Sequence, residues 1–158
     1  MGNFMVRPIG RIRSDEHGMR IELEREFIPA LTNLDGFSYI NVLWWFHQND
    51  TEESRSKLVE NGPYKNSPDK LGTFATRSPE RPNPIALTCA CITYLDFDNG
   101  IIGLAYMDAE DGTPVIDIKP YTPSLDRVEH PIVPDWCANW PKSIEASGDY
   151  DWGTVFNV

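Results

Sequence analysis

The sequence predicts an all-β, strand-dominated domain with one or two short helices, in which the strands close into a barrel. Most apolar segments are short and rich in β-branched and aromatic residues, as is typical of strands. Turn-forming residues separate these segments, most clearly Asp98-Asn99-Gly100. A closed barrel is favoured because closure removes exposed strand edges.

The first two strands are expected over residues 4–13 and 20–26. Pro8 cannot donate a ladder hydrogen bond, so the first strand is predicted to lie at an edge or to contain a bulge. In the second strand, Ile21 and Leu23 alternate with glutamates, which indicates one buried face.

A short helix is predicted over residues 27–34, because Pro29 suits its first turn and Gly36 lies just beyond its end. The next run, residues 37–46, is almost wholly apolar and predicts a strand buried on both faces. The polar residues 51–69 contain several breakers, and we expect a mobile excursion whose first part is helical.

Further strands are expected over residues 72–77, 85–97, 101–107 and 115–119. Cys89 and Cys91 alternate along the second of these and are predicted to be small core residues. Asp98-Asn99-Gly100 predicts a tight type I′ hairpin, because Asn-Gly tolerates positive φ.

At 158 residues the chain is most simply one domain, spanning residues 1–158. Residues 122–158 are expected to form an irregular tail packed on the barrel, with Trp136, Trp140 and Trp152 as anchors. No apolar run approaches the roughly 20 residues that span a bilayer, so no membrane partner is expected. The cysteines lack zinc-site spacing, which favours a reduced, cytoplasmic setting with no bound metal.

The net charge of −10 argues against broad, nonspecific binding to nucleic acid, which relies on Lys and Arg. Residues 65–81 nevertheless carry a net charge of +2. A small basic surface on an acidic protein is therefore expected, and it would bind an anionic partner only with help from shape and stacking.

The segment from Arg77 to Thr88 is dense in proline, arginine and asparagine, with Pro79, Pro82 and Pro84 spaced along it. Proline fixes φ and biases the preceding residue toward extended backbone, so this loop is stiff. One interpretation is a rigid surface turn with solvated arginines. The other is a preformed binding loop that presents two guanidiniums and a carboxamide.

Two further polar segments lie at predicted strand ends, namely His47-Gln48 and Asp111-Gly112-Thr113-Pro114. The second leads into Asp117, Lys119 and Tyr121. In a barrel such ends converge on one rim, where ligand sites often lie. Their charges, with backbone donors from Gly112 and Thr113, suit a zwitterionic small molecule. The simpler interpretations are a structural histidine and a plain turn.

Four runs resemble the TrmO (TsaA-like) family of S-adenosylmethionine-dependent tRNA methyltransferases. They are Pro8-Ile9-Gly10-Arg11-Ile12, the segment from Leu34 to Ile40, the segment from Gly72 to Ile85, and the segment from Asp111 to Tyr121. The resemblance extends from about Arg7 to Asp126.

This resemblance implies a single-sheeted β-barrel, distinct from Rossmann-like methyltransferases, that works as a homodimer with S-adenosylmethionine near the subunit interface. The implied reaction methylates N6 of N6-threonylcarbamoyladenosine in tRNA. The implied cofactor contacts are His47, Gln48, Arg77, Leu87, Asp111, Gly112, Thr113 and Pro114.

Two departures mark a compact branch of the family. Many bacterial members carry a Pro-Arg-Gln triplet after the first strand that contributes to the cofactor site, whereas this chain reads Asp15-Glu16-His17-Gly18-Met19-Arg20 there. The bacterial C-terminal extension has no obvious counterpart. Both departures bear on the tRNA substrate more than on the cofactor.

The expected mechanism is direct in-line transfer of the methyl group, with a general base for the N6 proton. Asp117 and Tyr121 are the catalytic candidates, with His47 as a further base, and Arg81, Asn83 and Lys119 are expected to bind the substrate. The alternatives are methylation of a small metabolite or another nucleotide, and a noncatalytic cofactor-binding module.

Overall fold

The structure is a computed structural model that describes residues 1–157, and it comprises two compact units. The first contains Met1–Asp50 and Pro84–Arg127, and the second contains Thr51–Asn83 and the chain from Val128 onward. Each unit is described by itself. The packing of residues 122–158 on the barrel stays a prediction.

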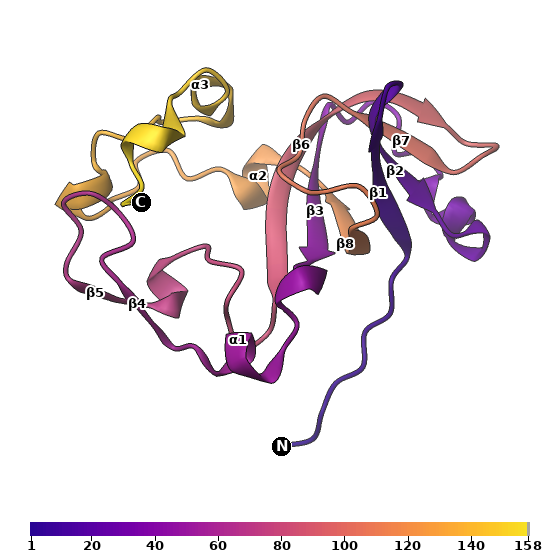
Figure 1. Cartoon of the computed structure of the whole chain (residues 1–158). Helices are drawn as coiled ribbons and strands as arrows, with labels where there is room; N and C mark the ends of the chain where they lie inside the picture. Colours follow the sequence, from indigo (N-terminus) through magenta and orange to yellow (C-terminus); the bar gives the residue numbers. More distant parts are fainter. Residues whose placement is uncertain (158) are drawn as a thin grey trace. The chain divides into compact units, whose positions relative to one another are not determined.

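The first unit contains a closed antiparallel barrel with the strand order β1-β2-β7-β6-β3-β8 (Figure 1). Its strands are β1 (Gly10–Asp15), β2 (Gly18–Leu23), β3 (Tyr39–Trp45), β6 (Ile85–Asp96), β7 (Ile101–Leu104) and β8 (Pro114–Pro120). β1 closes the barrel by pairing with β8, Gly10 opposite Val115. The predicted strand-dominated, closed barrel is confirmed.

The barrel interior is filled by one face of each strand, as expected for a small barrel. Ile12, Ile21, Ile40, Val42, Ile102 and Val115 are fully buried there. Along β3, buried residues alternate with partly exposed ones. The prediction that this strand is buried on both faces was wrong, because only its inner face contributes to the core of the barrel.

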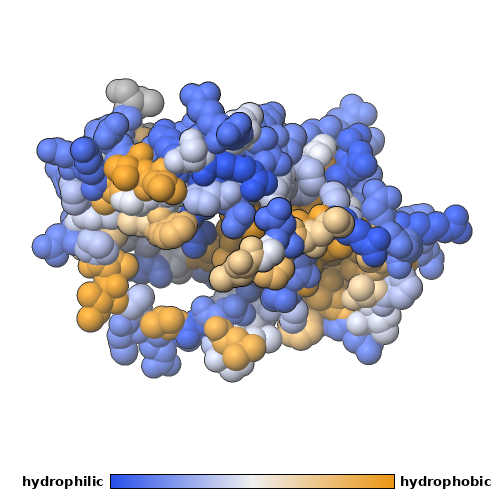
Figure 2. Space-filling view, turned by 90° about the horizontal axis from the view of Figure 1, so that it is seen from below, coloured by the Kyte–Doolittle hydropathy of each residue, from blue (hydrophilic) through white to orange (hydrophobic). Residues whose placement is uncertain are grey.

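The two cysteines of β6 lie on the opposite face from the one predicted. Ala86 and Ala90 face the core, 6% and 1% exposed, so the alternate residues Cys89 and Cys91 face away from it. Leu87 shares that outer face and is 49% exposed. Apolar residues reach the molecular surface elsewhere too, in patches separated by hydrophilic residues (Figure 2).

The N-terminal strand is shorter than expected, because β1 begins only at Gly10. Phe4 and Met5 are 89% and 95% exposed, so the segment before Pro8 contributes no side chains to the core. The predicted helix over 27–34 is instead a 3₁₀ helix, η1 (Arg25–Leu31), followed by Gly36 with φ of 98°.

The hairpin between β6 and β7 is present, but its turn type differs from the prediction. Asp96 pairs with Ile101, which leaves a four-residue loop, and only Gly100 in it has positive φ. A type I′ turn needs two such residues. The Asp96 carboxylate accepts the backbone N–H groups of Asp98 (3.1 Å) and Asn99 (3.0 Å) and thereby holds this wider loop.

The second unit begins with the predicted short helix, α1 (Glu52–Ser56), followed by the paired strands β4 (Val59–Asn61) and β5 (Lys70–Gly72). The expected strand over 72–77 was wrong. A 3₁₀ turn, η3 (Thr73–Ala75), replaces it, because the Thr76 hydroxyl and N–H both donate to the Thr73 carbonyl.

Between β8 and residue 157 the chain forms four short helical segments: α2 (Pro123–Asp126), η4 (Asp135–Cys137), α3 (Ile144–Ser147) and η5 (Trp152–Thr154). The three predicted anchor tryptophans pack within the second unit. Trp136 stacks on Tyr64 at 5.2 Å between ring centroids, and Trp140 contacts Trp136 and Trp152, both at 5.5 Å.

No helix within residues 1–157 is long and apolar enough to cross a membrane.

Candidate functional site

The structure brings together two of the three polar segments predicted from the sequence. His47 and Gln48 lie in η2 (His47–Asn49), directly after β3, and β3 pairs with β8 through Trp44 and Val115. The Gln48 carboxamide donates a hydrogen bond to the Glu110 carboxylate, immediately before Asp111. The His47-Gln48 segment and the turn before β8 therefore share one rim of the barrel.

The turn Glu110–Pro114, which we call the rim turn, is fastened to β1 by its backbone. Gly112 N–H donates to the Ile12 carbonyl at 2.7 Å, and Thr113 N–H donates to the Glu110 carbonyl at 3.2 Å. Both donors were expected to face a ligand, and the structure instead uses both to hold the turn. Within residues 1–157, the carbonyls of Asp111 and Gly112 accept no such bond and so remain as acceptors.

Gly112 adopts φ of 83°, a conformation that favours glycine, and an added Cβ would meet no atom within 4 Å. Glycine is therefore favoured at this position by the backbone conformation, and not by a lack of room for a side chain.

Leu87, Asp117 and Lys119 lie on the wall of the barrel rather than at this rim. Leu43 of β3 pairs with Leu87 on one side and with Asp117 on the other. Asp117 forms an ion pair with Lys119 at 3.1 Å, and its other oxygen accepts Ile118 N–H at 2.9 Å.

Tyr121 lies beside the other end of β3. Its N–H donates to the Tyr39 carbonyl at 3.0 Å, and the two rings are 6.4 Å apart. Because β3 runs over seven residues, its two ends are about 20 Å apart. A single barrel thus does not bring Tyr121 to the His47 rim, and its catalytic role stays a prediction.

Arg77, Arg81 and Asn83 belong to the second unit. The Arg81 side chain stabilises the loop that carries these residues. Arg81 Nη1 donates hydrogen bonds to the carbonyls of Ser78 (3.0 Å) and Thr76 (3.3 Å). Arg55 of α1 donates to the Pro82 carbonyl at 3.2 Å. The loop is therefore shaped by side-chain clamps as well as by its prolines.

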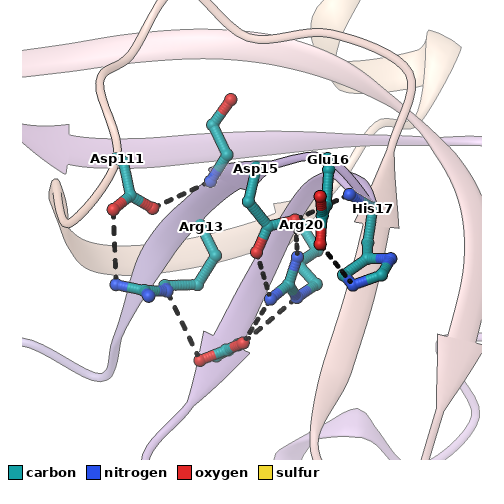
Figure 3. Close-up of polar contacts among 8 residues, drawn as sticks. Arg13, Asp15, Glu16, His17, Arg20 and Asp111 are labelled. Atoms are coloured by element: carbon teal, nitrogen blue, oxygen red, sulfur yellow. Dashed lines mark hydrogen bonds and ion pairs between the residues drawn. The ribbon is translucent and has the colours of Figure 1, made fainter.

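A charged network that sequence reasoning missed connects the β1–β2 hairpin to the rim turn (Figure 3). Arg20 forms a two-pronged pair with Asp15, both distances 3.0 Å, and also contacts Glu22 at 3.0 Å. Arg13 lies between Glu22 (3.9 Å) and Asp111 (3.4 Å). The charges on residues 13, 20 and 22 are close enough in sequence to have indicated contacts across a hairpin. Asp111 is too distant in sequence for a local pattern to predict its contact with Arg13.

The ion pair between Asp15 and Arg20 is expected to make the stability of the fold depend on pH in the acid range. The Arg20 side chain, with the His17 N–H, lowers the pKa of Asp15 to about 2. A carboxyl whose pKa is lowered on folding stabilises the fold above its unfolded pKa, and the stabilisation is lost as pH falls through the folded pKa. We expect Asp15→Asn to melt below wild type at pH 5–7, and the gap to close between about pH 4 and pH 2. Thermal melts followed by circular dichroism would measure it, and a gap independent of pH would contradict the assignment.

A small closed antiparallel barrel with polar segments at one rim is typical of barrel-type ligand-binding proteins and differs from glycine-loop nucleotide folds. Comparison with known proteins makes this specific. The family description "tRNA-methyltransferase O N-terminal domain" matches residues 6–127. The chain belongs to this family, which confirms the resemblance read from the sequence.

The names of two relatives are consistent with membership of this family. A "Probable S-adenosyl-L-methionine-binding protein" of Methanocaldococcus jannaschii is 40% identical over 125 residues, covering 78% of this chain and 96% of the relative. The human "tRNA (adenine(37)-N6)-methyltransferase" is 37% identical over 105 residues, covering 66% of this chain and 23% of that protein.

Solved structures of the family share the fold. One titled "Crystal structure of TrmO" has a TM-score of 0.67 and 30% identity, covering 84% of this chain and 64% of that one. TrmO from Pseudomonas aeruginosa has a TM-score of 0.63 and 29% identity, covering 83% of this chain. This chain spans only 62% of the length of the latter.

Proposed function

We propose that this chain is an S-adenosylmethionine-dependent tRNA methyltransferase that methylates N6 of N6-threonylcarbamoyladenosine. The observation that carries the proposal is the family match over residues 6–127, a range that includes every candidate site residue. The names of the relatives support the cofactor and the tRNA substrate separately, since one group is named for binding S-adenosylmethionine and the other for methylating tRNA adenine-37. A cytoplasmic homodimer is part of the proposal.

The hydrogen-bond acceptors at the rim fit the cationic groups of the proposed cofactor, its sulfonium and its ammonium. The free carbonyls of Asp111 and Gly112 are acceptors for cationic or N–H groups, and the nearby Glu110 and Asp111 side chains add negative charge. We propose that His47, Gln48, Leu87 and the rim turn hold the cofactor. Arg77 is proposed as a further contact on the resemblance alone.

The cofactor would supply a methyl group activated for transfer, so the protein needs no covalent intermediate. The chain's own residues would align the acceptor and remove one proton, because N6 loses its hydrogen as the new N–C bond forms. Asp117, Tyr121 and His47 are the proposed candidates for accepting that proton. Arg81, Asn83 and Lys119 are proposed to bind the threonyl carboxylate or phosphates, through charge-assisted hydrogen bonds where the side chain is charged.

The test is methyl transfer from labelled S-adenosylmethionine to total tRNA that does or does not carry the threonylcarbamoyl group. We expect label only in the modified tRNA, and only on adenosine nucleosides after digestion. Equal labelling of both tRNA pools would overturn the proposed substrate. Gly112→Val, strained at positive φ, serves as a variant with a damaged rim turn.

A second candidate keeps the cofactor but not the tRNA. The archaeal relatives are named only as binding proteins, and the net charge of −10 argues against broad binding to nucleic acid, which relies on Lys and Arg. Cofactor binding without transfer to any tRNA would favour methylation of a small metabolite or another nucleotide, or a noncatalytic binding module.

A further inference from the structure

The rim turn is contacted by residues of two elements, η2 and β1. From η2, Gln48 donates to Glu110. From β1, the Ser14 N–H donates to one oxygen of Asp111 at 2.9 Å, while Arg13 Nη1 lies 3.4 Å from the other oxygen. The Asp111 carboxylate is therefore occupied on both oxygens by β1, and it serves to fix the turn.

Arg13 is held in position by its own surroundings. It lies directly across the β1–β2 ladder from Arg20, a pairing of like charges that is unfavourable by itself. Glu22 contacts both arginines, and Asp15 holds Arg20 by two hydrogen bonds. Alternating charges thus run from Asp15 through Arg20, Glu22 and Arg13 to Asp111, as Figure 3 shows for the labelled members.

The contacts of the Asp111 side chain add to the backbone hydrogen bonds that fasten the rim turn to β1. Asp111 is half exposed, with 49% of its side-chain surface accessible, and the next residue is a glycine with positive φ. A glycine-containing turn samples many conformations unless its neighbours restrain it. Anchoring the Asp111 side chain therefore further restricts the directions in which the free carbonyls of Asp111 and Gly112 point.

We infer that Arg13 is a positioning residue, which orders the rim turn through Asp111 and so raises affinity for the cofactor without touching it. This inference rests on the proposed function of the rim turn.

The experiment measures S-adenosylmethionine binding by calorimetry for wild type, Arg13→Gln, Asp111→Asn and the double variant. Arg11→Gln is the matched control, because Arg11 lies on the same strand two residues away and pairs instead with Glu24 at 3.7 Å. An exposed ion pair contributes at most about 1 kcal/mol, so we expect Arg13→Gln to weaken binding about fivefold and Arg11→Gln to leave it unchanged.

The double variant separates positioning from a general loss of stability. If Arg13 acts through Asp111, Arg13→Gln has no further effect once Asp111→Asn is present. Where transfer is measurable, KM for the cofactor rises and kcat at saturation stays constant. Additive losses, or equal losses in Arg11→Gln, would overturn the inference. Absence of binding in wild type would instead overturn the proposed function.

Discussion

Arg77→Ala is expected to weaken S-adenosylmethionine binding strongly while leaving the protein folded. Arg77 is exposed, and the shape of its loop is held by the Arg81 and Arg55 contacts to backbone carbonyls. The family resemblance assigns its guanidinium to the cofactor, where a charged hydrogen bond contributes about 1.5–3 kcal/mol. Its loss should weaken binding by roughly 10- to 150-fold. Calorimetry measures the affinity, and a thermal melt confirms folding.

Arg25→Ala is the matched control for this change. Arg25 is an exposed arginine in η1, outside the candidate site, and its truncation should leave affinity as in wild type. Unchanged affinity in a folded Arg77→Ala variant would remove Arg77 from the cofactor site. A loss shared by both variants would point to an effect of net charge instead.

Gly10→Ala is expected to destabilise the barrel, unlike Gly72→Ala in β5. Gly10 pairs with Leu23 of β2 and with Val115 of β8, at the point where the barrel closes. An added Cβ would lie 2.4 Å from the Glu22 carbonyl oxygen, which belongs to backbone and cannot rotate away. Overpacking of this kind costs about 1–3 kcal/mol, or several degrees in melting temperature for a chain of this size.

Gly72→Ala provides the comparison. Gly72 has no atom within 4 Å of an added Cβ and no positive φ, so the substitution should be neutral or slightly stabilising. Thermal and urea unfolding of both variants measure the difference. Equal melting temperatures for Gly10→Ala and wild type would show that the β1–β2 contact is looser than this structure describes.

Much of the fold followed from local patterns. The alternation around Ile21 and the Asn99-Gly100 turn signal each predicted an element that the structure contains, although the turn type differed. The error about which face of β6 is buried has a clear cause. Whether Cys89 or Ala90 faces the core depends on which side of the strand the barrel closes, and both sides of β6 carry small or apolar residues. Periodicity alone cannot choose between two such faces.

The sequence predicted which residues belong to the candidate site, but not the hydrogen bonds that join them. Polar strand ends at His47 and Asp111 were recognisable because each adjoins a strongly apolar strand, and barrel closure brings them together at one rim through Gln48 and Glu110. The use of the Gly112 N–H could not be predicted from local sequence, because this group donates to Ile12, which is distant in sequence, whereas the Thr113 N–H donates to Glu110 within the same turn.

The sequence by itself determined the class of fold, the family and the stiffness of the proline-rich loop, because these depend on covalent chemistry and on short-range patterns. Only the tertiary structure decided what the charged groups of β1 do. Arg13 meets Asp111 because β1 closes the barrel against β8, and that pairing brings residues almost one hundred positions apart into contact. Non-local pairing is a property of the closed barrel as a whole, so no local pattern in the chain carries it.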